Sequence, residues 1–516
     1  MLRVELLLLG ESSNQCPKSP MKDSRTCPVT SRCGRDVGWR AVMTHHQRTE
    51  FALLRKTAEL AIDYLTELAE RPVGRPIAPD ALRAALGGDL PDRGDDPERV
   101  VARLARDVDP GLVATAGPRY FGFVIGGSLP VTVATEWLAA AWDQNAGNYP
   151  ASPAASVVEE VAGSWLRTLF GLPATASVGF VTGGTMANFT GLAAARHGVL
   201  QAVGYDVEAR GLVEAPPVTV IVGGEAHTTI FVALRMLGLG SERVTPVPAD
   251  GQGRMRADAL RRALEASTGP TIVCAQAGNV NTGAFDPVRE IAAATAERGA
   301  WLHVDGAFGL WAAASPRLRH HLDGVEMAQS WATDAHKWLN VPYDCGIVFV
   351  ADPVAHRAAM TVTADYLVRG AGEAYQAYDY VPESSRRARG LSVYVALRSL
   401  GRSGVAELVD RCCALARRIA HRLEAVPGVT ILNDVVLNQV LVRFAAPGDD
   451  DRGADERTAA VIAAIQSDGT CWAGGTIWRG RGAMRISVSN WSTTEEDIDR
   501  SAEAILRCAE SLGVPV

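Results

Sequence analysis

The most informative segment is Thr333-Asp334-Ala335-His336-Lys337-Trp338-Leu339-Asn340, which places a lysine beside a histidine in surroundings too apolar for ordinary surface. A lone lysine is usually a solvated side chain, so a His-Lys dipeptide by itself carries little weight. In apolar surroundings, however, the Lys337 amine is a candidate for trapping a carbonyl compound. The neighbouring segments decide between these two interpretations.

A second segment supplies an acid. Trp301-Leu302-His303-Val304-Asp305-Gly306-Ala307 is an apolar run that ends in a carboxylate and then in small residues. This pattern is typical of a buried strand that delivers Asp305 to its carboxyl end. Pyridoxal phosphate (PLP) requires a lysine that forms a Schiff base and an acid that pairs with the protonated pyridine nitrogen. The two segments together therefore indicate this cofactor.

A glycine loop provides a place for a phosphate. Gly179-Phe180-Val181-Thr182-Gly183-Gly184-Thr185-Met186-Ala187-Asn188 predicts a strand, a glycine turn and the start of a helix. Glycines let the backbone approach an anion closely, and the first N–H groups of a helix donate to it. The loop has no Walker lysine and is not G-x-G-x-x-G, which disfavours nucleotides as ligands.

A histidine follows another predicted strand. Gly224-Glu225-Ala226-His227-Thr228-Thr229 comes after the β-like run 218–222 and opens a helical pattern. A histidine at such a turn can present its ring face to a flat ligand. Taken singly, His227 can equally be a capping or hydrogen-bonded core histidine.

Together these elements resemble the PLP-dependent group II amino-acid decarboxylases, which include aromatic-amino-acid, glutamate and tyrosine decarboxylases. The resemblance runs from about Pro118 to Leu512, and its most specific part is His303-Val304-Asp305 followed by His336-Lys337-Trp338. It implies the α/β fold of the aspartate aminotransferases (fold type I). That fold has a mostly parallel central sheet flanked by helices and a smaller α+β C-terminal domain. Short β-like runs that alternate with Ala-rich helices agree with it.

The resemblance also implies a role for each matching residue. Lys337 is the Schiff-base lysine, and Asp305 is the partner of the pyridine nitrogen. His227 stacks on one face of the ring, and Ala307 packs against the other. The remaining implied cofactor contacts are the backbone of Gly184, Thr185 and Met186 at the phosphate, the side chains of Ser330 and His336 as phosphate donors, and Asn279 near the ring.

The sequence departs from the family pattern at two places. Many relatives have Asn-Pro before the His-Lys pair, whereas this chain has Asp334-Ala335. A phosphate would repel an acid beside it, so we expect Asp334 to point elsewhere and Thr333 to take its place. Asn279 and Val280 replace two threonines, which leaves the hydrogen bonding beside the ring open.

Composition and cysteine usage favour a large cytoplasmic enzyme. The chain has 516 residues, 47% of them hydrophobic and 21% charged, and a net charge of −7 that disfavours nucleic acid as a partner. Its nine cysteines contain no C-x-x-C pair, which favours a reducing compartment without a zinc site or any other metal site. The apolar run 6–9 is too short for a secretory signal, and no membrane association is expected.

The sequence divides into four regions. Residues 1–42 are polar and basic without periodicity, and we expect disorder there. Residues 43–125 form a helical arm whose long apolar stripe favours packing on a partner subunit. The resemblance likewise implies a homodimer with its active site at the subunit interface. Residues 126–365 are the expected PLP-binding domain, and residues 366–516 are the expected catalytic loop and small domain.

The substrate is expected to be an amino acid. Tyr120, Phe121 and Phe123 lie in a segment that resembles the family's aromatic substrate pocket, although a buried strand is an equal interpretation. These aromatic side chains favour an L-amino acid with an aromatic or apolar side chain.

In this family a tyrosine on a mobile loop protonates the substrate. Tyr380, with Tyr378 as the alternative, matches it within the Gly-rich segment 370–385. Aminotransferase chemistry, aldehyde formation and a catalytically silent homologue stay open as alternatives. The intact Lys337 and Asp305 argue against the last of these.

Overall fold

The computed structural model describes residues 45–74, 76–361 and 375–516. The predicted extension 1–42 lies outside the described residues, and so does the first part of the predicted tyrosine-bearing loop. The chain divides into the units Met1–Lys56 and Thr57–Val516, with helix α1 (His45–Glu67) running across the boundary. All contacts discussed below lie within the second unit.

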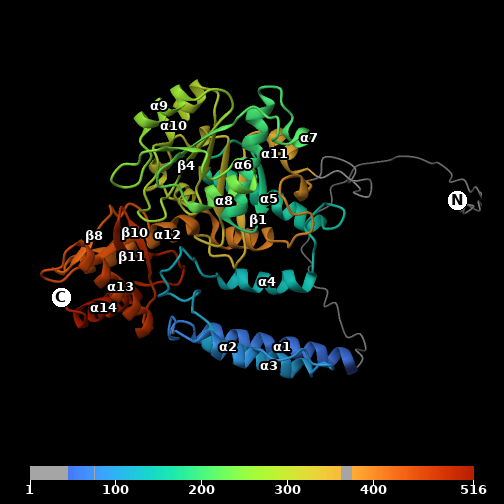
Figure 1. Cartoon of the computed structure of the whole chain (residues 1–516). Coiled ribbons are helices and arrows are strands. Elements are labelled where there is room, and N and C mark those ends of the chain that lie inside the picture. The colour runs from blue at the N-terminus through green and yellow to red at the C-terminus, as the bar shows by residue number, and fades with distance from the viewer. Residues whose placement is uncertain (1–44, 75, 362–374) are drawn as a thin grey trace, which may run out of the picture. The chain divides into compact units, whose positions relative to one another are not determined.

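A seven-stranded sheet organises the second unit (Figure 1), in the order β1-β7-β6-β5-β4-β2-β3. Neighbouring strands from β3 to β6 are parallel, and only β7 runs against its neighbours β1 and β6. The carboxyl ends of β2, β4, β5 and β6 therefore meet at one edge, where ligands of such sheets bind. The strands are β1 (Ser177–Val181), β2 (Thr219–Gly223), β3 (Val244–Val247), β4 (Thr271–Gln276), β5 (Trp301–Asp305), β6 (Ser330–Asp334) and β7 (Gly346–Val350).

Both faces of this sheet are buried, which explains why its strands read as continuous apolar runs. In β7, Ile347 and Phe349 enter one hydrophobic core, whereas Val348 and Val350 enter a second core on the opposite face. Helices α5 (Pro153–Phe170), α10 (Val288–Glu297) and α12 (Gly390–Glu424) contribute to the first core. Helices α6 (Gly184–Gln201), α8 (Thr228–Met236) and α11 (Pro353–Met360) contribute to the second. The remaining α-helices of this domain are α7 (Val207–Arg210) and α9 (Ala257–Ala266).

A smaller α+β region ends the chain and is drawn in orange to red in Figure 1. Its antiparallel sheet has the order β10-β11-β9-β8 and is covered by two helices. Its elements are β8 (Val429–Ile431), β9 (Gln439–Phe444), α13 (Asp451–Asp468), β10 (Gly474–Trp478), β11 (Arg481–Ser487) and α14 (Glu495–Ser511). The two sheets confirm the predicted fold class.

The helices before the large sheet leave apolar side chains exposed. Neither α2 (Pro79–Leu86) nor α3 (Pro97–Val108) has a buried residue. Leu86 and Leu104 are 50% and 54% exposed, as are Trp137 and Trp142 of α4 (Pro130–Trp142) at 43% and 51%. Within the described ranges, no helix is both long and apolar enough to cross a membrane.

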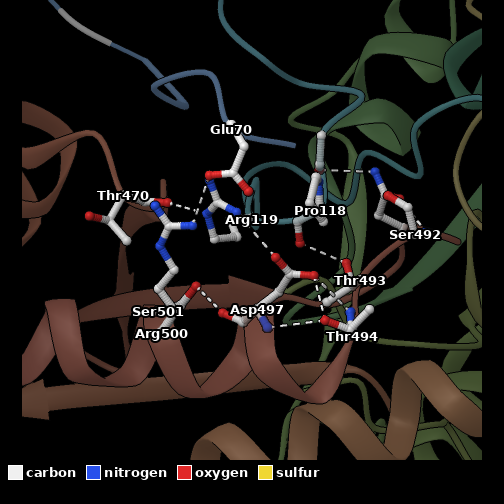
Figure 2. A network of polar contacts seen from close by, with 12 residues as sticks. Glu70, Pro118, Arg119, Thr470, Ser492, Thr493, Thr494, Asp497, Arg500 and Ser501 are labelled. Carbon is white, nitrogen blue, oxygen red and sulfur yellow. Dashed lines mark hydrogen bonds and ion pairs between the residues drawn. The ribbon is translucent and has the colours of Figure 1, made fainter. Parts of the chain in front are cut away.

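A polar network fastens the segment that enters the large domain to the small one (Figure 2). The Arg119 guanidinium donates from Nε to Thr470 O at 2.8 Å and pairs from Nη1 with Asp497 Oδ1 at 3.1 Å. Thr493 Oγ1 donates to Pro118 O at 2.7 Å. Asp497 also belongs to the capping box with which Thr494 starts α14. The backbone just before Tyr120 is thereby held in place.

Candidate active site

A cavity of about 540 Å³ lies at the carboxyl edge of the large sheet. We call it the Lys337 cavity. It brings together Lys337, Asp305 and His227, each from a different strand end or loop. Its other lining residues include Gly184, Thr185, Met186, Ala307, His336 and Phe123.

Lys337 follows β6 and its amine is paired. Lys337 Nζ lies 2.9 Å from Asp334 Oδ2, and the lysine side chain is 19% exposed while that of the aspartate is 2% exposed. This arrangement corrects the expectation that Asp334 points away. The carboxylate turns towards the amine, and a Cβ added to Gly184 would lie only 2.8 Å from Asp334 Oδ2. Thr333 is buried with its hydroxyl on Ala307 O and does not line the cavity.

Asp305 ends β5 and is 4% exposed. Its Oδ2 accepts a hydrogen bond from Asn188 Nδ2 at 3.0 Å, and its Oδ1 accepts one from Ala307 N at 3.1 Å. Asn188 lies in α6, so the helix that follows the glycine loop also orients the acid. Asn188 was not predicted from the sequence as a site residue, although it stands at the end of the segment that contains the glycine loop.

His227 has the capping position that the sequence allowed for it, and it also lies at the Lys337 cavity. It caps α8, because its Nδ1 accepts from Thr229 N at 3.3 Å and lies 2.8 Å from the Thr229 hydroxyl. It also lines the Lys337 cavity. Burial lowers the pKa of His227, which favours a neutral ring. A neutral imidazole held at Nδ1 is suited to stacking on a flat ligand.

The glycine loop forms an anion cradle at the start of α6. A Cβ on Gly183 would lie 3.2 Å from His336 Cε1, and one on Gly184 would collide with Asp334. Both positions favour glycine, because a Cβ would require His336 or Asp334 to shift, and the first N–H groups of α6 have no partner within the helix. His336 adds a further donor. Cys345 N donates to His336 Nδ1 at 3.1 Å, so Nε2 carries the proton of the neutral ring.

Two predicted cofactor contacts are not brought to the cavity. Ser330 opens β6, whereas Asp334 ends it at the cavity edge, so Ser330 lies about 13 Å away along the strand. Its hydroxyl instead accepts from Trp301 Nε1 and lies 2.8 Å from His303 Nδ1. Asn279 turns its Oδ1 to the N–H groups of Asn281 and Thr282 at 2.9 and 3.2 Å, which closes its own turn.

The aromatic segment contributes less than expected. Phe123 lines the cavity, but Phe121 is a core residue at 1% exposure. Tyr120 is also buried and stacks on Trp472 with a ring separation of 5.0 Å. Trp472 in turn lies 5.5 Å from the Phe123 ring and so supports the cavity wall from behind. Phe123 and Val124 both have positive φ, a costly conformation for such residues that is often found at ligand sites.

The two predicted proton donors, Tyr380 and Tyr378, lie outside the Lys337 cavity. Tyr380 is stacked on Tyr375 at 5.4 Å and meets His356 edge-on at 5.2 Å. Tyr378 is 2% exposed. Neither phenol lines the Lys337 cavity, because this segment packs beside the edge strand β1, with the carbonyl of Tyr380 close to Gly179.

Arg485 is the cavity residue that sequence reasoning missed. It lies on β11 of the small domain and donates from Nη1 to Val280 O at 3.1 Å. Among the described residues, no carboxylate lies within ion-pair distance of it, and burial lowers the pKa of its guanidinium. A half-buried cation without a carboxylate partner at a cavity is a candidate for binding a carboxylate of a ligand. Only the tertiary fold brings this residue of the small domain to the cavity that contains Lys337.

These residues fit PLP. The cavity offers an amine, a buried acid held by hydrogen bonds, a neutral imidazole and a glycine cradle that a Cβ would obstruct. PLP uses all four of these groups: the amine for its aldehyde, the acid for its ring nitrogen, the imidazole for its ring face and the cradle for its phosphate.

The comparisons with known proteins agree. A family model described as the pyridoxal-dependent decarboxylase conserved domain matches residues 79–445. Tryptophan decarboxylase 1 of Oryza sativa subsp. japonica is 27% identical over 480 residues, covering 88% of this chain and 92% of the relative. The 4-hydroxyphenylacetaldehyde synthase of Rhodiola rosea is 25% identical over 471 residues, covering 88% and 94%.

The fold is similarly shared. The crystal structure of Oryza sativa TDC with PLP and tryptamine superposes with a TM-score of 0.84 at 24% identity, covering 92% of this chain and 99% of that one. The chain belongs to the pyridoxal-dependent decarboxylase family. It is thus an enzyme of the carboxy-lyase type, with PLP as its cofactor.

Proposed function

We propose that this enzyme decarboxylates an L-amino acid with an aromatic or apolar side chain, releasing the amine and CO₂. The observation that carries the proposal is the convergence of Lys337, Asp305 and His227 on one cavity beside the glycine cradle. Each of these residues keeps the role that the family resemblance implies for it.

The protein's own groups divide the work. Bound PLP supplies an electron sink for a bond at the substrate Cα. Asp305, oriented by Asn188, holds a proton at the ring nitrogen, which keeps that sink effective. His227 and Ala307 would hold the cofactor ring between them, and Lys337 would supply the amine that binds its aldehyde.

Arg485 is proposed to orient the substrate carboxylate. Arg485 is half-buried at the cavity, and its guanidinium uses one donor on Val280 O, which leaves the other donors for a ligand. A carboxylate held there is removed from water, and loss of CO₂ from a desolvated carboxylate is favoured. The Phe123 ring, backed by Trp472, offers an apolar wall for the side chain.

A homodimer and a cytoplasmic location are part of the proposal. The exposed apolar side chains of α2, α3 and α4 support a partner subunit that covers them and completes the site at the interface. The described cysteines are all free, which supports a reducing compartment. Light scattering that gives a monomeric mass for fully active enzyme would contradict the dimer.

Aldehyde formation is the second candidate, because an aldehyde synthase is among the relatives. The deciding experiment incubates the PLP-loaded enzyme with each common L-amino acid and quantifies amine, CO₂, aldehyde, keto acid and peroxide. The proposal expects equal amounts of amine and CO₂ from an aromatic or apolar substrate. Aldehyde with peroxide favours the second candidate, and keto acid without CO₂ indicates transamination. Lys337→Ala is the control for turnover at this cavity.

A further inference from the structure

Asp334 stands at the phosphate end of the Lys337 cavity, where a negative charge is least expected. Its carboxylate reaches Lys337 Nζ at 2.9 Å and lies against Gly184, the first residue of α6. The N–H groups that are to bind the cofactor phosphate begin at this same residue. The side chain is almost fully buried, so water does little to screen its charge.

The carboxylate is only half satisfied. Oδ2 pairs with Lys337, but Oδ1 is buried and has no hydrogen-bond partner. His336 Nε2 lies 3.6 Å from Oδ1, which is too long for a hydrogen bond. A buried acceptor without a donor is costly, and the cost is usually retained for a functional reason.

The Asp334 side chain is not needed to hold its own backbone. Asp334 N donates to Ala307 O at 2.9 Å, and Trp311 Nε1 donates to Asp334 O at 3.0 Å. The residue also pairs with Gly346 in the sheet. A neutral side chain of the same shape can therefore occupy this position without loss of the strand.

We propose that Asp334 weakens the hold of this enzyme on PLP. Its carboxylate pairs with the Lys337 amine and places a negative charge beside the cradle at Gly183 and Gly184. A bound phosphate must be accommodated against that charge, and Lys337 must leave its partner. His336 Nε2 is the donor for which Asp334 and the phosphate then compete. The inference rests on the proposed roles of Lys337 and the glycine loop.

The experiment compares PLP with pyridoxal, which has the same aldehyde but no phosphate, on cofactor-free wild type and Asp334→Asn. Dissociation constants are measured from the absorbance of the bound cofactor. For Asp334→Asn we expect PLP to bind about tenfold more tightly or better, and pyridoxal to gain clearly less. Unchanged or weaker binding of PLP would overturn the proposal, and so would equal gains for both compounds.

Two further variants sharpen the experiment. Asp410→Asn removes one negative charge from α12, outside the cavity, and is expected to leave both dissociation constants unchanged. Asp334→Ser removes the same charge with a smaller side chain and replaces the asparagine variant if thermal unfolding shows that the latter does not fold. Because cofactor binding is measured, the outcome does not depend on which amino acid is the substrate or which product forms.

Discussion

Asn188 holds Asp305 in place: its Nδ2 donates to Asp305 Oδ2 at 3.0 Å, while its Oδ1 lies 2.9 Å from His303 Nε2. Since the amide oxygen can only accept, His303 carries its proton on Nε2, and its Nδ1 accepts from the Ser330 hydroxyl. A continuous chain of hydrogen bonds thus runs from the amino end of β6 to the acid at the cavity. It gives Ser330 a supporting position rather than a place at the phosphate.

Asn188→Ala is expected to weaken both the fold and the cofactor site. It leaves His303 Nε2 without an acceptor and frees Asp305 to rotate, at a cost of about 1–3 kcal/mol for each buried unsatisfied group. Thermal unfolding and PLP titration of the cofactor-free protein check this. Thr190→Val in the same helix, which loses only a bond to Met186 O, is the control. A wild-type dissociation constant for PLP in Asn188→Ala would contradict the role of Asn188.

Arg485→Gln is expected to raise KM for the substrate about tenfold to a hundredfold, because a charge-assisted hydrogen bond to a carboxylate contributes about 1.5–3 kcal/mol. The affinity for PLP should change little, since the guanidinium contacts Val280 O rather than the glycine cradle. Steady-state kinetics and cofactor titration separate the two effects. Arg481→Gln, on the same strand but exposed, should behave as wild type. An unchanged KM in Arg485→Gln would remove the arginine from substrate binding.

Sequence patterns located the parts of this site that depend on local structure. Asp305 and His227 were predictable because each follows an apolar run at the cavity edge, and Gly184 because a glycine turn opens a helix. Ser330 was assigned to the phosphate only by the family resemblance, whereas the structure places it at the amino end of β6, beside His303.

The parts that the sequence did not yield come from distant segments. Arg485 and Trp472 reach the cavity wall from the small domain. The periodicity of hydrophobic residues within one segment does not reveal such contacts between distant segments. Tyr380 matched a short motif, yet its position is decided by packing on Tyr375 and His356. Asp334 was misplaced because repulsion from a phosphate was considered without the attraction of Lys337.

Buried histidines should make the enzyme sensitive to acid. Burial lowers the pKa of His303 and of His356 to about 3, from an unfolded value of 6.5. Below pH 6.5 each of these histidines is protonated in the unfolded chain but stays neutral in the folded one. Each therefore lowers the free energy of unfolding by about 1.4 kcal/mol per pH unit until the pH nears 3. Asp286, whose pKa burial raises to about 6, acts in the opposite direction between pH 6 and 4.

His356→Gln tests this account outside the cavity. The fall of Tm with pH between 6.5 and 5 should be shallower than in wild type, by the contribution of one proton. His421→Gln, in the last turn of α12, is the control, because that side chain is exposed in the folded protein. Parallel Tm curves for wild type and His356→Gln would contradict the assignment.

The pairing of Arg119 with Asp497 links stability to substrate binding. The two side chains are 3% and 15% exposed, and removing one partner of a buried pair costs about 3–5 kcal/mol because the other charge is left unpaired. A double-mutant cycle of Arg119→Met and Asp497→Asn isolates the pair, so the double variant should be more stable than the sum of the single losses predicts.

Arg119 directly precedes the segment that carries Phe123 to the cavity wall, and it also holds Thr470 near Trp472. Arg119→Met should therefore raise KM more than it lowers kcat, whereas Asp497→Asn should affect KM less, because the Arg119 bond to Thr470 O persists. Equal KM values in both variants, with an additive cycle, would show that the network stabilises the domain contact without positioning the cavity wall.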